Sequence, residues 1–287
     1  MIVYLNGSFL PQDEARVSVL DRGFLFGDGV YEVIPAYGGR LLRLDQHLDR
    51  LEHSLDGLRI RNPCDRARWR EILEGLLERN PGDDRSVYLQ VTRGAAAKRD
   101  HAFPPPEVEP TVFAMVTPIA QPDPASVERG VHAFTYDDTR WSRCDIKAIT
   151  LLPNVLLRQQ AIDAGGQEAI LIRDGLATEG AASNLFIVRN GVMTTPPKDH
   201  RVLPGITRDL VVEIAQANDL PLVEADIPVA DLLAADEVWL TSSTKEVMAV
   251  TELDGRPVGD GRPGPVWRRM HVLYQDYKAR LREVAAG

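Results

Sequence analysis

A lysine beside an apolar run is the residue whose type and place most suggest chemistry. Lys147 stands within the stretch Cys144-Asp145-Ile146-Lys147-Ala148-Ile149, in a chain where only five of the 33 Lys and Arg residues are lysines. Arginine stays protonated, whereas a desolvated lysine is partly neutral and can act as a nucleophile or a base. An ordinary surface lysine at a strand end is the alternative, because buried lysines are rare.

A carboxylate among small residues is the second candidate. Glu179 lies in Thr178-Glu179-Gly180-Ala181-Ala182-Ser183-Asn184, between a predicted turn and an apolar strand. A carboxylate with small neighbours suits a flat ring packed closely against it. A glutamate on a solvated turn is the alternative.

Three features suit an anion such as phosphate. Residues 203–209 place Pro204, Gly205 and Thr207 before an amphipathic helix, whose first N–H groups and dipole would favour an anion, although Thr207 could equally serve as a plain N-cap. The hydroxyl cluster at residues 241–244 follows a predicted strand, as turn residues often do. Arg50, off the leucine stripe of its predicted helix, is either a bidentate phosphate ligand or a surface arginine.

The segment Phe26-Gly27-Asp28-Gly29 has two glycines around an acid, as in a dinucleotide-binding loop. The third glycine of that motif is missing, and a predicted strand follows rather than a helix, so no helix N-terminus would meet a pyrophosphate. We therefore predict a turn that places Tyr31 at the start of a strand.

Composition excludes several classes of protein. Hydrophobic residues make up 44% and charged residues 26%, and the net charge is −9, which disfavours a general nucleic-acid binder. The apolar runs are too short to span a bilayer. Cys64 and Cys144 form no CxxC pair, and the N-terminus lacks a basic region followed by an apolar core. We expect a reduced, cytoplasmic protein with no membrane partner.

The predicted elements alternate between hairpins and helices. Helices are expected after a cap at Asp45 and at residues 65–80, 153–164, 207–218 and 265–284, and hairpin turns at 6–7, 38–39, 174–175, 190–191 and 254–255. Prolines crowd residues 103–124. We predict an N-terminal α/β domain at 1–119, a linker at 120–124 and a C-terminal domain at 125–287.

Taken in order, these segments resemble the fold-type IV pyridoxal-5′-phosphate (PLP) enzymes, and within them the D-amino-acid aminotransferases. The resemblance covers essentially the whole chain. It is carried by Asp21-Arg22-Gly23-Phe24, Phe26-Gly27-Asp28-Gly29-Val30-Tyr31-Glu32-Val33, His47-Leu48-Asp49-Arg50-Leu51, Gln90-Val91-Thr92-Arg93-Gly94, Arg143-Cys144-Asp145-Ile146-Lys147, the segment around Glu179, Gly205-Ile206-Thr207-Arg208-Asp209 and Thr241-Ser242-Ser243-Thr244.

The resemblance implies a fold and a cofactor site. The fold would be α/β, with a small N-terminal domain and a larger, β-barrel-like PLP-binding domain. Lys147 would bind PLP as a Schiff base and move the substrate proton, and Glu179 would keep the pyridine nitrogen protonated. The phosphate would be held by Arg50, by the amides of Ile206 and Thr207, and by Ser242 and Ser243. No metal is implied.

The resemblance also implies substrates. Tyr31, Arg99 and His101 would grip the α-carboxylate of D-alanine or D-glutamate, with 2-oxoglutarate or pyruvate as acceptor in a ping-pong reaction of a homodimer. Three departures bear on substrate preference. The loop at 94–101 is one residue longer than in relatives, and Ala182 replaces a serine. With Pro204, residues 203–208 read Leu-Pro-Gly-Ile-Thr-Arg, a motif more typical of branched-chain aminotransferases.

Three other functions stay open. The first is a branched-chain L-amino-acid aminotransferase on the same scaffold, from which Arg99 and His101 would distinguish this chain. The second is a lyase of the 4-amino-4-deoxychorismate type, which would use the same lysine to eliminate pyruvate. The third is a non-catalytic small-molecule-binding protein that keeps the fold.

Overall fold

A computed structural model describes residues 1–283 and divides into two compact units. Unit 1 contains Met1–Ala120, Ile146–Thr150 and the chain from Leu281, and unit 2 contains Gln121–Asp145 and Leu151–Arg280. The domain limits given above remain a prediction. One difference bears on chemistry: Lys147 falls within the predicted C-terminal domain, but in the structure it belongs to unit 1.

Unit 1 is built on a six-stranded antiparallel sheet in the order β2-β1-β6-β5-β3-β4. The hairpins predicted at 6–7 and 38–39 are confirmed, and each turn residue that needs a left-handed backbone is Asn or Gly. The strands are β1 (Ile2–Leu5), β2 (Ser8–Pro11), β3 (Gly29–Tyr37), β4 (Arg40–Leu41), β5 (Asp84–Thr92) and β6 (Thr111–Pro118).

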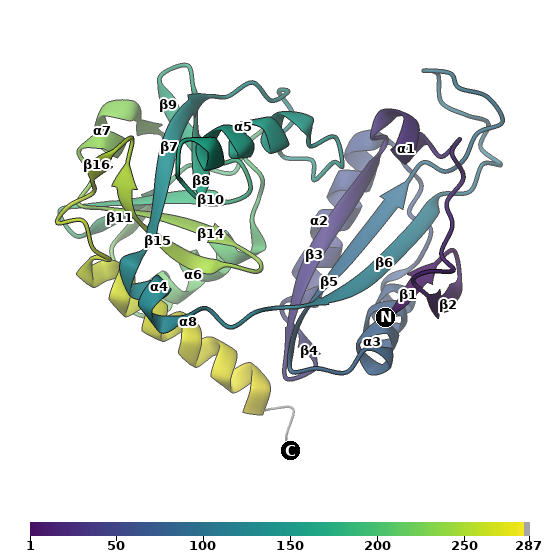
Figure 1. Ribbon diagram of the computed structural model, residues 1–287, viewed down its shortest axis with the longest axis horizontal. Coiled ribbons are helices and arrows are strands. Elements are labelled where there is room, and N and C mark those ends of the chain that lie inside the picture. The colour runs from purple at the N-terminus through teal and green to yellow at the C-terminus, as the bar shows by residue number, and fades with distance from the viewer. Residues whose placement is uncertain (284–287) are drawn as a thin grey trace. The chain divides into compact units, whose positions relative to one another are not determined.

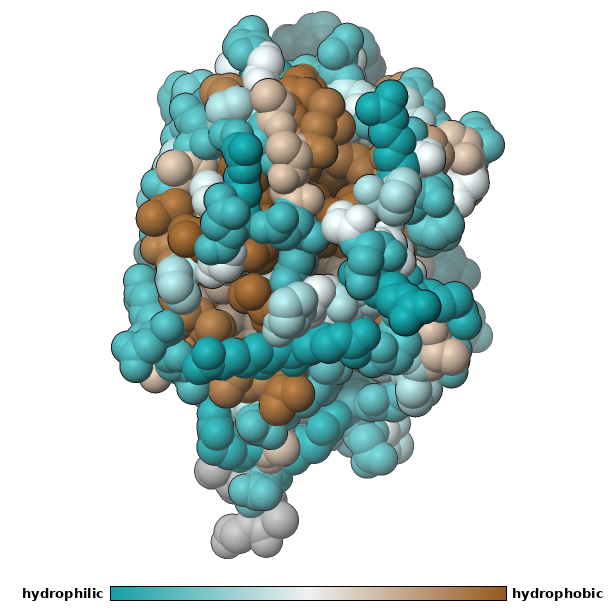
Figure 2. All heavy atoms as spheres, turned by 90° about the vertical axis from the view of Figure 1, so that its left-hand side faces the viewer, coloured by the Kyte–Doolittle hydropathy of each residue, from teal (hydrophilic) through white to brown (hydrophobic). Residues whose placement is uncertain are grey.

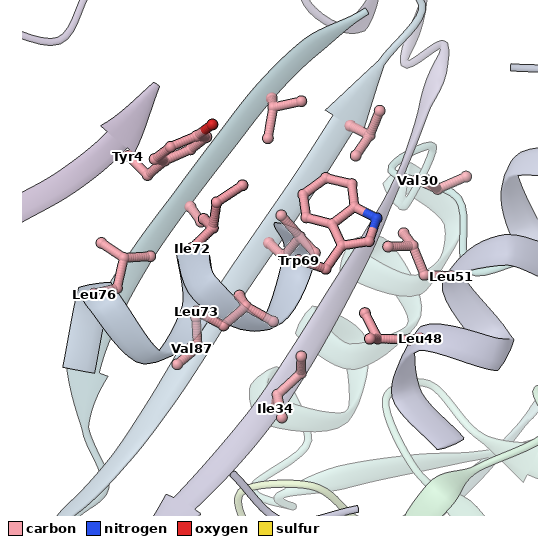
Figure 3. Packing of buried hydrophobic residues seen from close by; sticks show 14 of the residues in the cluster. Tyr4, Val30, Ile34, Leu48, Leu51, Trp69, Ile72, Leu73, Leu76 and Val87 are labelled. Carbon is pink, nitrogen blue, oxygen red and sulfur yellow. The ribbon is translucent and has the colours of Figure 1, made fainter. Parts of the chain in front are cut away.

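Two helices, α2 (Leu44–Leu58) and α3 (Arg66–Arg79), pack on one face of this sheet, and the short α1 (Arg22–Phe26) precedes β3 (Figure 1). Figure 3 shows Leu48 and Leu51 of α2 and Trp69 of α3 directed at the strands. Burying side chains of this size contributes about 1.5–3 kcal/mol each, so this layer fixes α2 on the sheet.

The start of α2 corrects one prediction. The helix begins at Leu44, its N-cap is Arg43 with φ +51°, and Asp45 lies inside the first turn, so the predicted Asp45 cap is wrong. Leu44 is buried, and its packing starts the helix one residue earlier than cap preference suggests. The cap predicted at Asp65 is confirmed, because its side chain accepts from Arg68 N.

Unit 2 contains a closed barrel of six strands, which confirms the barrel-like domain that the resemblance implied. The strands pair in the order β10-β14-β15-β7-β8-β9, and the pairing of Glu179 with Asn184 joins β9 back to β10. The ring and its side strands are β7 (Val131–Asp137), β8 (Glu168–Arg173), β9 (Leu176–Gly180), β10 (Asn184–Arg189), β11 (Val192–Thr195), β12 (Leu222–Glu224), β13 (Ile227–Pro228), β14 (Glu237–Ser242), β15 (Glu246–Leu253) and β16 (Arg256–Pro257).

Helices surround this barrel (Figure 1). Leu210 of α6 and Trp267, Met270 and Tyr274 of α8 join Trp239 of β14 in one buried cluster, which fixes α6 and α8 on the sheet. The helices of unit 2 are α4 (Pro124–Arg129), α5 (Leu152–Asp163), α6 (Ile206–Ala217), α7 (Val229–Leu233) and α8 (Pro265–Glu283), the last of which ends in unit 1.

Apolar side chains also reach the surface. Figure 2 shows them gathered in patches among hydrophilic ones on one face of the molecule. On α5, Leu152, Val155 and Leu156 are each more than half exposed. Within residues 1–283, no helix is both long and apolar enough to cross a bilayer.

Candidate functional site

Lys147 lies on a strand-like segment along the start of β3. Tyr31 N donates to Lys147 O at 3.0 Å, Ile149 N donates to Gly29 O at 3.0 Å, and Lys147 N donates to Ser54 Oγ of α2 at 3.1 Å. Its neighbours Ile146 and Ala148 are buried while Lys147 is half-buried. The backbone is therefore fixed from two elements, and the side chain is partly desolvated yet reachable. Lys147 is therefore not the freely solvated surface lysine of the alternative interpretation.

The side chain of Lys147 meets an aromatic wall. Its Nζ lies 4.3 Å from the ring centroid of Tyr31, which stacks on Tyr88 at 5.8 Å. Burial raises the pKa of Tyr88 to about 12, and its hydroxyl donates to Gln90 at 2.7 Å. Tyr31 stands near the start of β3 after a turn in which Gly27 has φ +67°, as predicted, and no helix follows that turn. The structure thereby excludes a dinucleotide loop.

Arg50 is a buried cation, not a surface arginine. Its Nε and Nη2 donate to the two carboxylate oxygens of Glu32 at 2.8 and 2.7 Å, and His47 Nδ1 lies 2.7 Å from Glu32 Oε2. Burial alone would raise the pKa of Glu32, but Arg50 and His47 outweigh it and hold that pKa far below its usual range. Burial lowers the pKa of His47, so a neutral imidazole donates from Nδ1 to the carboxylate.

This ion pair gives a first testable result. In Glu32→Gln, Arg50 loses its charged partner inside the protein, and we expect the free energy of unfolding to fall by about 3 kcal/mol, the low end for breaking a buried pair. Glu52→Gln is the control. Glu52 lies on α2, as Arg50 does, but it is exposed and pairs with Arg66 at the surface, where an ion pair contributes little to stability. Denaturant unfolding followed by circular dichroism measures both. Equal stability of the two variants would contradict the assignment.

Arg99 and His101 lie together on an exposed loop. The guanidinium of Arg99 is 4.8 Å and the ring of His101 is 5.4 Å from the ring centroid of Phe26 in α1. The loop backbone is held by Arg22, whose Nη1 donates to Asp100 O at 2.6 Å and to Ala102 O at 3.2 Å. Unit 1 thus brings the two predicted carboxylate ligands onto one aromatic platform.

Glu179 is buried and fully hydrogen-bonded in unit 2. Its Oε1 accepts from Arg140 Nη1 at 2.5 Å, and its Oε2 accepts from Asn184 Nδ2 at 3.1 Å and Leu203 N at 3.0 Å. Burial raises the pKa of this carboxyl, while Arg140 and the N–H of Leu203 oppose the rise. The solvated-turn alternative is excluded, and the carboxylate is held in one orientation.

A second carboxylate, Asp138, shares Arg140 with Glu179 and was not predicted from the sequence. Asp138 accepts from Arg140 Nε and Nη2, each at 2.9 Å, and pairs with Arg173 Nη2 at 2.9 Å. Burial would raise the pKa of Asp138, but the two guanidinium groups outweigh it and lower the pKa. Arg140 was missed because its partner Glu179 lies 39 residues away, and only the barrel brings them together.

The N-terminus of α6 has the donors that an anion needs. The N-cap is Gly205, and no described side chain caps the helix, so Thr207 as an N-cap is wrong: it is the buried second residue of the helix. A Cβ on Gly205 would come within 1.8 Å of Asn184 Oδ1, so only glycine fits. Asn184 Nδ2 also donates to Leu203 O at 2.8 Å. Asn184, which had no predicted role, therefore fixes both Glu179 and the entry to α6.

The hydroxyls at the end of β14 lie next to the same asparagine. Thr241 pairs with Asn184 across the sheet, and its buried Oγ1 has no hydrogen-bond partner within residues 1–283. Ser242 and Ser243 follow, both half-buried. A phosphate would use free hydroxyl donors and a helix N-terminus, and a pyridine nitrogen would use a buried carboxylate, so the donor set of unit 2 fits PLP.

The predicted site residues divide between the two units. Unit 1 holds Tyr31, Arg50, Arg99, His101 and Lys147, and unit 2 holds Glu179, Ile206, Thr207, Ser242 and Ser243. In the part of the chain that the structure describes, no group of three or more His, Cys, Asp or Glu residues is arranged to hold a metal ion.

The chain is similar to known proteins both in sequence and in fold. The sequence profile of the amino-transferase class IV family matches residues 29–253. A D-alanine aminotransferase of Bacillus licheniformis is 42% identical over 276 residues, 96% of either chain. The branched-chain amino acid aminotransferase of Escherichia coli has a TM-score of 0.90 at 26% identity, covering 96% of this chain and 93% of that one. Another branched-chain amino acid aminotransferase, from T.th. and solved with pyridoxamine 5′-phosphate, has a TM-score of 0.89 at 29% identity, with the same coverage.

Proposed function

We propose that this chain, which belongs to the class IV aminotransferase family, transfers the amino group of D-alanine or D-glutamate to 2-oxo acids such as 2-oxoglutarate or pyruvate. The observation that carries the proposal is the 42% identity to a D-alanine aminotransferase over nearly the whole of both chains. The two substrates would use one site in turn, in a ping-pong reaction. The family makes the chain a PLP-dependent enzyme.

A branched-chain L-amino-acid aminotransferase is the second candidate, because both solved structures described above carry that name. Their identities are 26% and 29%, against 38–42% for the D-alanine aminotransferases. The pair Arg99 and His101 on Phe26 also favours the D-amino-acid assignment, since two cationic or hydrogen-bonding groups held side by side suit a substrate carboxylate.

When bound, PLP supplies the electron sink for the pair of electrons left when the substrate Cα loses its proton. We assign to Lys147 the covalent anchoring of the cofactor and the transfer of that proton by its Nζ. The ring centroid of Tyr31 lies 4.3 Å from Lys147 Nζ. We assign to Tyr31, together with Arg99 and His101, the orientation of the substrate carboxylate. Arg140 and Asn184 hold Glu179 so that its carboxylate can keep the pyridine nitrogen protonated.

The phosphate ligands are assigned from the same reasoning. The amides of Ile206 and Thr207 open α6 without a side-chain cap, and Ser242 and Ser243 add hydroxyl donors. Arg50 is the remaining proposed phosphate ligand. Its buried pair with Glu32 would hold the guanidinium in one orientation.

We also propose a homodimer, supported by the exposed apolar side chains of α5, Leu152, Val155 and Leu156. Exposed apolar residues that follow one another on a helix are typical of a surface that a partner covers. A cytoplasmic location remains a prediction from the sequence.

One assay separates the candidate functions. The protein is incubated with PLP and 2-oxoglutarate together with D-alanine, L-alanine or L-leucine, and the 2-oxo acid products are measured. We expect pyruvate from D-alanine and little product from either L-amino acid. Product from L-leucine alone would replace the proposal with the branched-chain one, and product from L-alanine alone would overturn the assignment to D-amino acids. Pyruvate released from 4-amino-4-deoxychorismate without an acceptor would indicate the lyase, and a colourless, inactive protein after PLP addition would indicate a binding protein.

A further inference from the structure

The residue that ends the turn after β14 and begins β15 has a conformation that its type disfavours. Glu246 has φ +60°, and it pairs with Ser242 across the turn. Short hairpin loops often need one left-handed residue, and glycine or asparagine normally supplies it. A glutamate there costs about 1–3 kcal/mol of backbone strain, which persists only if other contacts hold it. The turn therefore has a glutamate for a reason beyond its backbone.

That reason is visible in the contacts of its side chain with α8. Lys278 Nζ pairs with Glu246 Oε1, and Gln275 Nε2 donates to Glu246 Oε2 at 2.6 Å. Lys278 also donates to Gln275 Oε1 at 3.2 Å, which closes the cluster. Lys278 is only 3% exposed although lysine is among the residues least often buried. We call Glu246, Gln275 and Lys278 the turn tether.

The turn tether holds one end of the segment that carries the proposed phosphate hydroxyls. Ser242 and Ser243 lie between Thr241, which is paired to Asn184, and Glu246, which is tied to α8. One end of the segment is thus fixed on the Asn184 side and the other on the helix. The helix α8 is itself packed on β14 through Trp267 and Met270. Its position is therefore fixed, and Lys278 holds the turn in place relative to it.

We propose that Lys278 and Glu246 are positioning residues for phosphate binding by Ser242 and Ser243, an inference that rests on the proposed function, in which those serines bind the phosphate of PLP. The buried pair holds the strained turn so that both hydroxyls are arranged before the anion arrives. Preorganised donors bind an anion more tightly because less conformational entropy is lost on binding. The contacts of the pair described above lie between the turn and α8, so we expect its effect to fall on the phosphate hydroxyls.

The test compares two ligands that differ only in the phosphate. Dissociation constants for PLP and for pyridoxal are measured by absorbance on the apo-protein, for the wild type, Lys278→Met and Glu246→Gly. Glycine suits the left-handed backbone of the turn, so Glu246→Gly removes the turn tether without adding strain. Arg268→Met is the matched control, because Arg268 also lies on α8 but is exposed and pairs with Glu128 instead of Glu246.

We expect PLP affinity to fall about tenfold to a hundredfold in Lys278→Met and Glu246→Gly, the effect of losing charged or well-placed hydrogen bonds. Pyridoxal affinity should be unchanged in both, and Arg268→Met should match the wild type for both ligands. Equal losses for PLP and pyridoxal, or no loss of either, would overturn the inference. A wild type that binds PLP no better than pyridoxal would instead overturn the proposed phosphate site, and the inference with it.

Discussion

Replacing Lys147 with alanine should abolish transamination and leave both units folded. Lys147 Nζ is the one side-chain amine on the segment paired with β3, and its neighbours Ile146 and Ala148 carry the packing. Removing the amine removes both the covalent anchor and the group that moves the substrate proton. A positioned general base alone supplies about 10²–10⁴-fold, so kcat should fall by at least that factor.

The control for this variant is Lys147→Arg. Arginine keeps a positive charge beside Tyr31 but stays protonated, so it should be as inactive as alanine. Activity is followed by pyruvate formation from D-alanine, and folding by circular dichroism and the melting temperature. Substantial turnover by either variant would show that Lys147 is not the reactive group.

Replacing Glu179 with glutamine should slow turnover by about 10²–10³-fold while PLP still binds. The glutamate charge is the one that would keep the pyridine nitrogen protonated, and loss of one preorganised electrostatic partner has effects of that size. The site should otherwise persist, because Asp138 still holds Arg140 at 2.9 Å and the glutamine oxygen can accept from Leu203 N.

A second buried glutamate controls for loss of structure. Glu237 accepts from Val266 N at 2.9 Å and Trp267 N at 2.8 Å at the start of α8, and it is not part of the proposed site. Glu237→Gln should lower the melting temperature but leave turnover per folded molecule near the wild type. If the Glu179 and Glu237 variants lost turnover equally, the effect at Glu179 would be structural.

Local signals in the sequence predicted the local structure well. The Asn6-Gly7 and Asn190-Gly191 turns form hairpins because asparagine and glycine accept the left-handed backbone that such turns need, and Asp65 caps α3 with its side chain. The errors fell at helix starts. Packing of Leu44 decided the first turn of α2, and a tight approach to Asn184 placed glycine at the cap of α6, so Thr207 was not needed there.

Contacts between distant segments could not be predicted from spacing. Lys147 follows the proline-rich boundary, yet it pairs with β3 in unit 1, because strand pairing depends on the tertiary fold and not on sequence distance. The partners of Glu179 have the same origin. Residue types alone suggested a reactive lysine, a carboxylate and anion sites, and the resemblance to a family supplied their roles, which remain proposals.

The most direct test is a single half-reaction. Purified protein loaded with PLP is mixed with D-alanine or L-alanine in the absence of any 2-oxo acid, and the pyruvate formed is compared with the amount of protein. The account predicts one equivalent of pyruvate per chain from D-alanine, none from L-alanine, and none from Lys147→Ala with either. Pyruvate from L-alanine only, or from the Lys147→Ala protein, would contradict it.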